Sequence, residues 1–438
     1  FVAIADVAHY VEPGSPLDRE AYLRGTSVYF PDRCIPMLPP ELSEGVCSLK
    51  SGVNRLTMTV EIPIRPGGTP GTPSFHPSVI RSRARLTYDE VHSFLGTGPL
   101  EEKGGRPGGA KITPEIGRML RDMAMAAGGL TLARFGRGAL DLDLPEAEIA
   151  VVEGMPDSVK PSERFESHRL IEEFMLLANT AVAEYLSGRG DAFLFRIHEE
   201  PAMEKIEEFE VAAGKLLRRS RPTDRRGTSS LLQAWADLAR GGKFERAVHR
   251  MLLRSLMLAR YGSETKGHFG LALSRYTHFT SPIRRYPDLL VHRVLKAALG
   301  DRGSADSLRT LREKGPEIGS HLSGRERLAT EAERALEQRA KALLMAGQVG
   351  RPFEGTVSSL VSSGFFVELE GWMIDGMVHI STLRDDEYRI SPDRMEWVGQ
   401  YRKRRIGLGD RVRVRVRRAD PDRGEVDFLL VEKMPESP

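Results

Sequence analysis

The sequence predicts a protein of two parts: an α+β domain with a mixed sheet backed by helices, and then a five-stranded β-barrel of the OB type. At 438 residues the chain is too long for one ordinary domain. Its first part opens with short apolar strands and turns and becomes mainly helical after Ile112. Beyond Gln348 the pattern changes to five short strands separated by turns, at 353–360, 364–369, 373–379, 412–416 and 426–431.

This change of pattern sets the expected domain boundaries. Residues 1–347 should form the α+β domain, residues 348–433 the barrel and residues 434–438 a short tail.

Three helical regions stand out in the first domain. Residues 168–186 are apolar on most sides, which predicts a buried helix. Residues 229–261 predict two helices divided at Gly241-Gly242, and residues 317–344 predict one long charged helix.

The composition narrows the class of protein. Hydrophobic residues make up 40% and charged residues 29% of the chain, a globular balance. Cys34 and Cys47 alone can form neither a disulfide framework nor a zinc site, so we expect a cytoplasmic protein. No apolar run is long enough to span a membrane, and the opening residues lack a basic leader. A start at Phe1, inside an apparent strand, predicts that the chain begins within a domain.

Basic residues are concentrated although the net charge is only +3. They cluster in 218–226, at Arg284 and Arg285, and in 402–418. Such stripes fit a polyanionic partner, and they are also common on ordinary solvated surfaces.

The segment around Arg284 and Arg285 is the first candidate site. Ser281 as N-cap and Pro282 at the first position predict a helix that places both arginines in its first turn. Backbone N–H groups and the helix dipole favour an anion there, and guanidinium groups recognise phosphate. The alternative is that both arginines pair with a local carboxylate such as Asp288.

Other polar groups carry weaker signals. Glu172 and Glu173 lie inside the apolar helix, where one should need a partner and the other should reach solvent. The glycine-flanked 267–271 segment predicts a packed turn. Asp141 and Asp143 should be solvated, and no group of acids forms the tight cluster that two-metal chemistry requires.

The barrel strands carry aromatic and basic side chains. We expect Phe353 and Phe365 to fill the barrel, and Phe366 and His379 to contact a ligand. Alternating arginines should form an outward basic face, made by Arg411, Arg413, Arg415 and Arg417. A basic face together with aromatic rings suits single-stranded nucleic acid.

Taken together, these segments resemble the ribonuclease R and ribonuclease II family, and its ribonuclease R branch most closely. The matching segments are long and irregular: 2–11, 28–32, 35–39, 42–43, 47–49, 168–173, 195–198 and 267–288. In the barrel, 364–367 and 376–381 resemble an S1 RNA-binding domain.

This resemblance implies a magnesium-dependent, processive 3′-to-5′ exoribonuclease that releases nucleoside 5′-monophosphates from single-stranded RNA in RNA turnover. It implies a narrow RNA channel and, by position, a set of roles. Tyr29 should stack near the 3′ end, Tyr88 and Glu172 should recognise the ribose, and Glu333 should line the 3′-end pocket. Arg284 should make a catalytic contact to the scissile phosphate, with Arg285 beside it. In the barrel, Phe366 and His379 should contact RNA.

Three departures from the family pattern qualify this expectation. Leu142 stands where a second stacking Phe is expected, and Ser363 replaces an aromatic residue of S1 domains. The family's metal-binding aspartates precede the strand at 2–6, so we expect no metal site in this chain and no activity from it alone. We expect a monomer, with the ribosome or RNA-decay factors as possible partners. The alternatives are a non-catalytic RNA-binding relative and an assembly factor whose barrel docks to protein.

Overall fold

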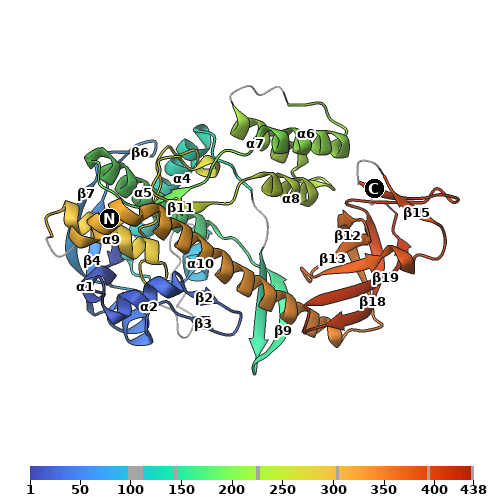
Figure 1. Ribbon diagram of the computed structural model, residues 1–438, viewed down its shortest axis with the longest axis horizontal. Helices are drawn as coiled ribbons and strands as arrows, with labels where there is room; N and C mark the ends of the chain where they lie inside the picture. Colours follow the sequence, from blue (N-terminus) through green and yellow to red (C-terminus); the bar gives the residue numbers. More distant parts are fainter. Residues whose placement is uncertain (97–111, 143–145, 223–226, 302–304, 392–394, 436–438) are drawn as a thin grey trace.

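A computed structural model of the chain describes residues 1–96, 112–142, 146–222, 227–301, 305–391 and 395–435. Asp143, residues 223–226 of the basic segment and the last three residues of the tail lie outside these ranges. A large body and a smaller C-terminal body are joined by the long helix α10 (Ala305–Ala346), as Figure 1 shows. No helix in the described ranges has the length and apolar character needed to cross a membrane.

The large body contains small antiparallel sheets. Its main sheet has the order β1 (Val2–Ala5), β4 (Asn54–Glu61) and β7 (Ser74–Arg81). Four two-stranded sheets accompany it: β2 (Val28–Tyr29) with β3 (Cys34–Ile35), β5 (Ile64–Arg65) with β6 (Thr69–Pro70), β8 (Ala147–Val152) with β9 (Met155–Pro161), and β10 (Phe195–Ile197) with β11 (Arg260–Gly262).

This arrangement differs from the expected mixed sheet. All the strand pairs just named are antiparallel. Parallel pairing needs a crossover connection of a dozen or more residues, usually a helix. The chain instead returns from β4 to β7 through the short β5–β6 hairpin, and the two strands pair antiparallel. The described residues of this domain contain both helices and antiparallel sheets, as expected for an α+β domain.

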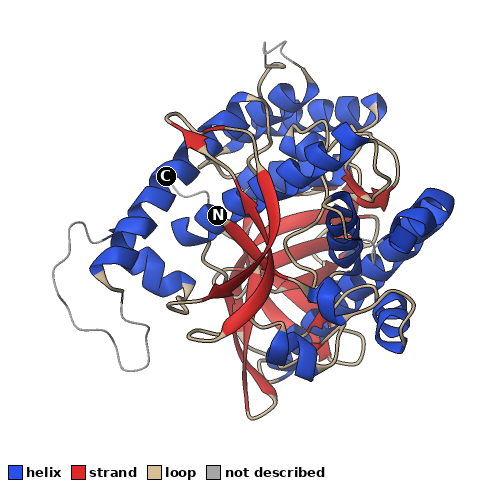
Figure 2. Ribbon diagram, turned by 90° about the vertical axis from the view of Figure 1, so that its left-hand side faces the viewer, coloured by secondary structure: helices blue, strands red, loops and turns tan. Residues whose placement is uncertain are grey.

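Helices make up most of the remaining large body and lie outside the strands in the turned view of Figure 2. The expected buried helix is α5 (Glu166–Arg189), and the pair divided at Gly241-Gly242 is confirmed as α7 (Thr228–Ala239) and α8 (Glu245–Ser255). Helix α10 starts earlier than predicted. The other α-helices are α1 (Val7–Tyr10), α2 (Pro16–Arg24), α3 (Tyr88–Gly96), α4 (Pro114–Gly136), α6 (Met203–Leu217) and α9 (Tyr286–Ala298).

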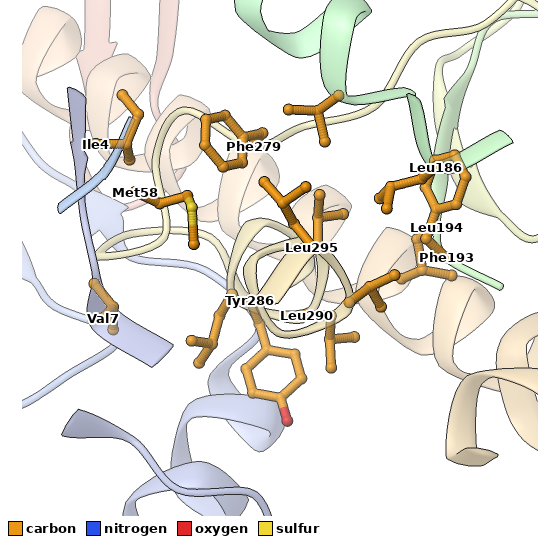
Figure 3. Close-up of a cluster of buried hydrophobic side chains, with 14 of the residues drawn as sticks. Ile4, Val7, Met58, Leu186, Phe193, Leu194, Phe279, Tyr286, Leu290 and Leu295 are labelled. Carbon is orange, nitrogen blue, oxygen red and sulfur yellow. The ribbon is translucent and has the colours of Figure 1, made fainter. Parts of the chain in front are cut away.

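The main core surrounds α9. Every residue of α9 from Tyr286 to Leu295 is buried, and side chains from β1, β4 and the end of α5 pack around it, as Figure 3 shows. A helix that is buried all round is a rigid support. It therefore fixes the segment that enters it, which is the segment carrying Arg284 and Arg285.

The C-terminal body contains the five predicted strands. β12 (Pro352–Val361), β13 (Gly364–Leu369), β14 (Asp375–His379), β19 (Glu425–Lys433) and β18 (Arg411–Asp420) form a closed barrel in that order. Between β14 and β18 lies a further sheet that the sequence did not predict: β15 (Tyr388–Ile390), β16 (Glu396–Gly399) and β17 (Arg405–Gly407).

The barrel is anchored to the large body on two sides. Its core continues into the β8–β9 hairpin through Ile149 and Val159, and into the end of α10. From helix α8, Arg246 and Arg250 both bind the buried carboxylate of Glu368. A buried carboxylate that loses its partners is costly, so moving the barrel away from α8 would be unfavourable.

Candidate nucleic-acid interface

A tight turn after α2 brings Tyr29 toward Arg284. Gly25 ends α2 with a φ of 72°, and a side chain there would meet the Cβ atom of Arg325 at 2.7 Å. Only glycine suits both demands. The backbone N–H of Ser27 then donates to the Arg284 carbonyl at 3.0 Å, and the Thr26 hydroxyl donates to the same oxygen at 3.1 Å.

The helix predicted to begin at Ser281 begins instead at Tyr286. Residues 282–284 form a turn, and Arg285 is the N-cap of α9. The Arg284 carbonyl is engaged by Ser27 and Thr26, and the Asp288 carboxylate accepts from the Ser281 N–H at 2.7 Å. The expectation that helix N–H groups and the helix dipole act at Arg284 was therefore wrong.

Three of the expected site residues converge at this turn. The Glu333 carboxylate, from α10, accepts from the Tyr29 backbone N–H at 2.7 Å. Burial raises the pKa of the Tyr29 phenol, and the nearby positive charge of Arg284 partly offsets that rise. Arg284 is exposed, and within the described residues it has no ion-pair partner. The Tyr29 ring and the Arg284 guanidinium group are thus both exposed, and the charge of Arg284 acts on the phenol.

Arg285 behaves differently from Arg284. Its Nε donates to Asp288 Oδ2 at 2.9 Å and its NH2 donates to Asp288 Oδ1 at 2.8 Å. Asp288 is fully buried. The local ion pair, which the sequence left open for both arginines, is therefore formed by Arg285. An RNA contact by Arg285 stays a prediction.

Tyr88 and Glu172 lie at a second place, where α3 packs on the start of α5. A capping box of Thr87 and Glu90 begins α3 at Tyr88. The Tyr88 ring stacks on His168, with ring centroids 3.9 Å apart, and His168 is one helical turn before Glu172.

The two neighbouring acids of α5 have separate partners. Glu172 is half-exposed and its Oε2 binds Arg164 at 2.5 Å. Glu173 is buried and its Oε1 accepts from Arg134 NH2 at 2.6 Å. The expectation that one acid would need a buried partner and the other would reach solvent is confirmed.

On the barrel, Phe366 and His379 lie on one outer face. Phe366 pairs with Met377 across β13 and β14, and His379 lies two residues beyond Met377, so the two side chains are diagonal neighbours. Phe365 is fully buried and Phe353 packs on the barrel core, as expected.

The expected basic face of β18 is partly neutralised. Arg411 binds Glu354 and Glu370, and Arg413 binds Glu354 and Glu432. The valines between these arginines point inward as predicted, but the facing acids come from other strands, which alternation along β18 could not reveal. Arg415 and Arg417 are exposed.

A cluster of histidines was missed by sequence reasoning. The His198 and His268 rings lie 5.0 Å apart, and the glycine-flanked 267–271 segment is indeed a packed turn, with the Gly270 N–H donating to His198 Nδ1. The Tyr261 hydroxyl is 2.8 Å from His278 Nδ1. The available signal was that His198 follows Ile197 and His278 precedes Phe279, both of which are buried.

The departure at Leu142 has a structural counterpart. Its side chain packs against the apolar cluster formed by α6, α7 and α8. A leucine there fills space in the cluster and offers no flat ring for a base.

Magnesium does not fit the residues present. Within the described ranges no three His, Cys, Asp or Glu side chains gather closely enough to hold a metal ion. Asp6, which follows β1 and caps α1, is buried and its Oδ2 binds Lys296 Nζ at 2.9 Å. Hard divalent cations need several oxygen ligands, which this set does not supply.

Two protein-family models match this chain, one for each body of the structure. A model of the RNB domain matches residues 1–301, and a model of the S1 RNA binding domain matches residues 347–430. The fold and the site define an RNB domain followed by an S1 domain.

Individual relatives narrow this class further. Ribonuclease R of Aquifex aeolicus is 41% identical over 436 residues, which cover 99% of this chain and 60% of that protein. The apo form of Mycoplasma genitalium RNase R superposes with a TM-score of 0.90 at 28% identity, covering 98% of this chain and 66% of that one. The same protein in complex with ribose methylated single-stranded RNA gives 0.88 at 28% identity, with the same coverage. The chain belongs to the ribonuclease R family and spans less than two thirds of the Aquifex protein.

Proposed function

We propose that this chain is the RNA-holding part of a 3′-to-5′ exoribonuclease that hydrolyses single-stranded RNA processively and releases nucleoside 5′-monophosphates in RNA turnover. The observation that carries the proposal is the convergence of Tyr29, Arg284 and Glu333 from segments far apart in sequence. A guanidinium group binds phosphate and a tyrosine ring stacks on a base, so the turn offers both contacts that an RNA end needs.

Each residue has a role in this proposal. Arg284 binds the scissile phosphate, Tyr29 stacks near the 3′ end, and Glu333 both holds the Tyr29 backbone and lines the pocket for the 3′ end. Phe366 and His379 contact RNA farther from that end, on the face where they are neighbours. The Mycoplasma relative bound to single-stranded RNA has the same fold, which supports RNA as the ligand.

Hydrolysis requires groups beyond those described. Magnesium would supply a Lewis acid and an activated water at the phosphate. We propose that its carboxylate ligands belong to a part of the protein outside these residues, since the described residues offer no such set. What this chain contributes is binding and orientation of the RNA end.

Binding of labelled single-stranded RNA, measured by fluorescence anisotropy, tests the proposal. The wild-type chain should bind, and Arg284→Ala should weaken binding about tenfold, because a hydrogen bond to a charged group contributes roughly 1.5–3 kcal/mol. The slope of log K against the logarithm of the salt concentration should decrease in magnitude by about one. Arg189→Ala, at the far end of α5 and paired with Asp191, is the control and should bind like wild type.

Two other outcomes have definite meanings. Absence of RNA binding by the wild-type chain would contradict the proposal, and equal affinity of Arg284→Ala and wild type would remove Arg284 from the site. With magnesium added, this chain should leave the RNA intact. If the complete protein also binds RNA but does not shorten it, the chain belongs to a non-catalytic RNA-binding relative.

A further inference from the structure

Four aromatic rings join α3 to the start of α5. Tyr88 and His92, one turn apart on α3, stack on His168 and Phe165, with centroids 3.9 Å and 4.5 Å apart. The Ser167 hydroxyl also donates to the Tyr88 carbonyl at 2.8 Å. The Tyr88 ring is therefore held from below by a ring and at its backbone by a hydroxyl, although the residue is 44% exposed.

His168 is itself fixed in orientation. Its Nδ1 accepts from the backbone N–H of Phe165 at 3.1 Å, so the ring cannot turn without losing that hydrogen bond. Because residues i and i+4 of a helix are neighbours, His168 lies directly beside Glu172 on α5. One ring thus stacks on Tyr88 and comes from a residue one helical turn before Glu172.

Arg164 holds that carboxylate from the other side. Its NH2 binds Glu172 Oε2 at 2.5 Å, and among the described residues Oε1 has no hydrogen-bond partner. Each carboxylate oxygen can accept up to two hydrogen bonds, so Oε1 can accept from a hydroxyl while Oε2 stays bound to Arg164. Arg164 and Glu172 side chains are 36% and 37% exposed, so a ligand can reach the free oxygen.

We infer that Arg164 and His168 are positioning residues for ribose recognition. Arg164 aims the free oxygen of Glu172 and His168 sets the plane of Tyr88, so that Glu172 and Tyr88 together hold a ribose 2′-hydroxyl. The inference rests on the proposed function, in which Tyr88 and Glu172 meet the ribose. Arg164 and His168 need not touch the RNA themselves. Preference for RNA over DNA then depends on four side chains, two that touch the sugar and two that hold them in place.

Single-stranded RNA carrying one 2′-deoxynucleotide at successive positions from its 3′ end tests this. For the wild-type chain one position should cost about tenfold in affinity, because a hydroxyl bonded to a carboxylate is lost. In Arg164→Met that penalty should fall to about twofold or less, while affinity for the fully deoxy strand should stay the same. His168→Ala should reduce the penalty in the same way.

Conservative variants separate positioning from folding. His168→Phe keeps a ring under Tyr88 but lacks the Nδ1 acceptor, so it should restore part of the penalty, and Arg164→Lys should also restore part of it. Arg189→Met, an arginine with a carboxylate partner at the other end of the same helix, should leave the penalty unchanged. A Glu172→Gln, Arg164→Met double variant should lose no more discrimination than Glu172→Gln alone.

The outcomes distinguish this inference from the proposed function. If Glu172→Gln removes the penalty but Arg164→Met and His168→Ala keep it, the positioning role is wrong and ribose recognition stands. A larger penalty in Arg164→Met would mean that Arg164 withholds the carboxylate from RNA, which also contradicts the inference. If the wild-type chain shows no penalty at any position, the ribose role proposed for Tyr88 and Glu172 fails, and the inference fails with it.

Discussion

Arg285→Met should strongly destabilise the protein, while the same substitution at the adjacent Arg284 should leave its stability almost unchanged. Removing the Arg285 guanidinium group leaves the fully buried Asp288 carboxylate without its charge partner. Breaking a buried pair on one side costs about 3–5 kcal/mol, whereas an exposed substitution stays within about 0.5 kcal/mol. Urea unfolding followed by circular dichroism measures both values.

RNA binding should show the opposite order. Arg284→Met should weaken RNA binding, and Arg285→Met, measured at a temperature where it is fully folded, should weaken it less. Asp288→Ala should be as destabilising as Arg285→Met, because it leaves the arginine unpaired. A stable Arg285→Met protein that binds RNA as poorly as Arg284→Met would instead make Arg285 an RNA ligand, as the sequence suggested.

The two arginines show what the sequence could and could not predict. Both follow Ser281-Pro282, and local rules assign them the same environment. Their difference comes with residues 25–27, about 260 positions earlier in the chain: Thr26 and Ser27 donate to the Arg284 carbonyl, and the Tyr286 N–H donates to the Gly25 carbonyl. Hydrogen-bond partners this far apart leave no local pattern, so only the structure separates the exposed arginine from the buried one.

The barrel strands were predictable for the opposite reason. Alternation of Val412, Val414 and Val416 with arginines is a local signal, and the valines do face inward. The acids that neutralise Arg411 and Arg413 come from β12, β19 and the end of β13, so their positions depend on strand order and register. The three-stranded sheet β15–β17 was missed because its strands of three or four residues alternate too briefly to be recognised.

The histidine cluster leads to the second large effect, a loss of stability in mild acid. Burial lowers the pKa of His268 to about 3 and also lowers the pKa of His198. Burial, together with the charges of Arg285 and Arg196, lowers the pKa of His278 well below its usual value. Tyr261 and Tyr276 pack on these rings as neutral groups, and Glu326, whose charge acts on Tyr261, is bound to Arg196.

The sign of the effect follows from proton uptake. In the unfolded chain each histidine binds a proton near pH 6.5, while in the folded chain the three stay neutral to lower pH. The unfolded state therefore binds more protons below about pH 6.5, and stability falls as the pH falls. Each fully neutral histidine contributes about 1.4 kcal/mol per pH unit to this loss, and for His268 the loss continues down to about pH 3.

Unfolding free energies measured between about pH 7 and pH 5 test this, with His268→Gln beside the wild type. A glutamine cannot take up a proton, so the slope of the unfolding free energy against pH should decrease by the contribution of one histidine. His379→Gln, a change at an exposed histidine of the barrel, should keep the wild-type slope. Equal slopes for wild type and His268→Gln would mean that His268 already holds a proton when folded, and that water reaches its place between His198 and Tyr276.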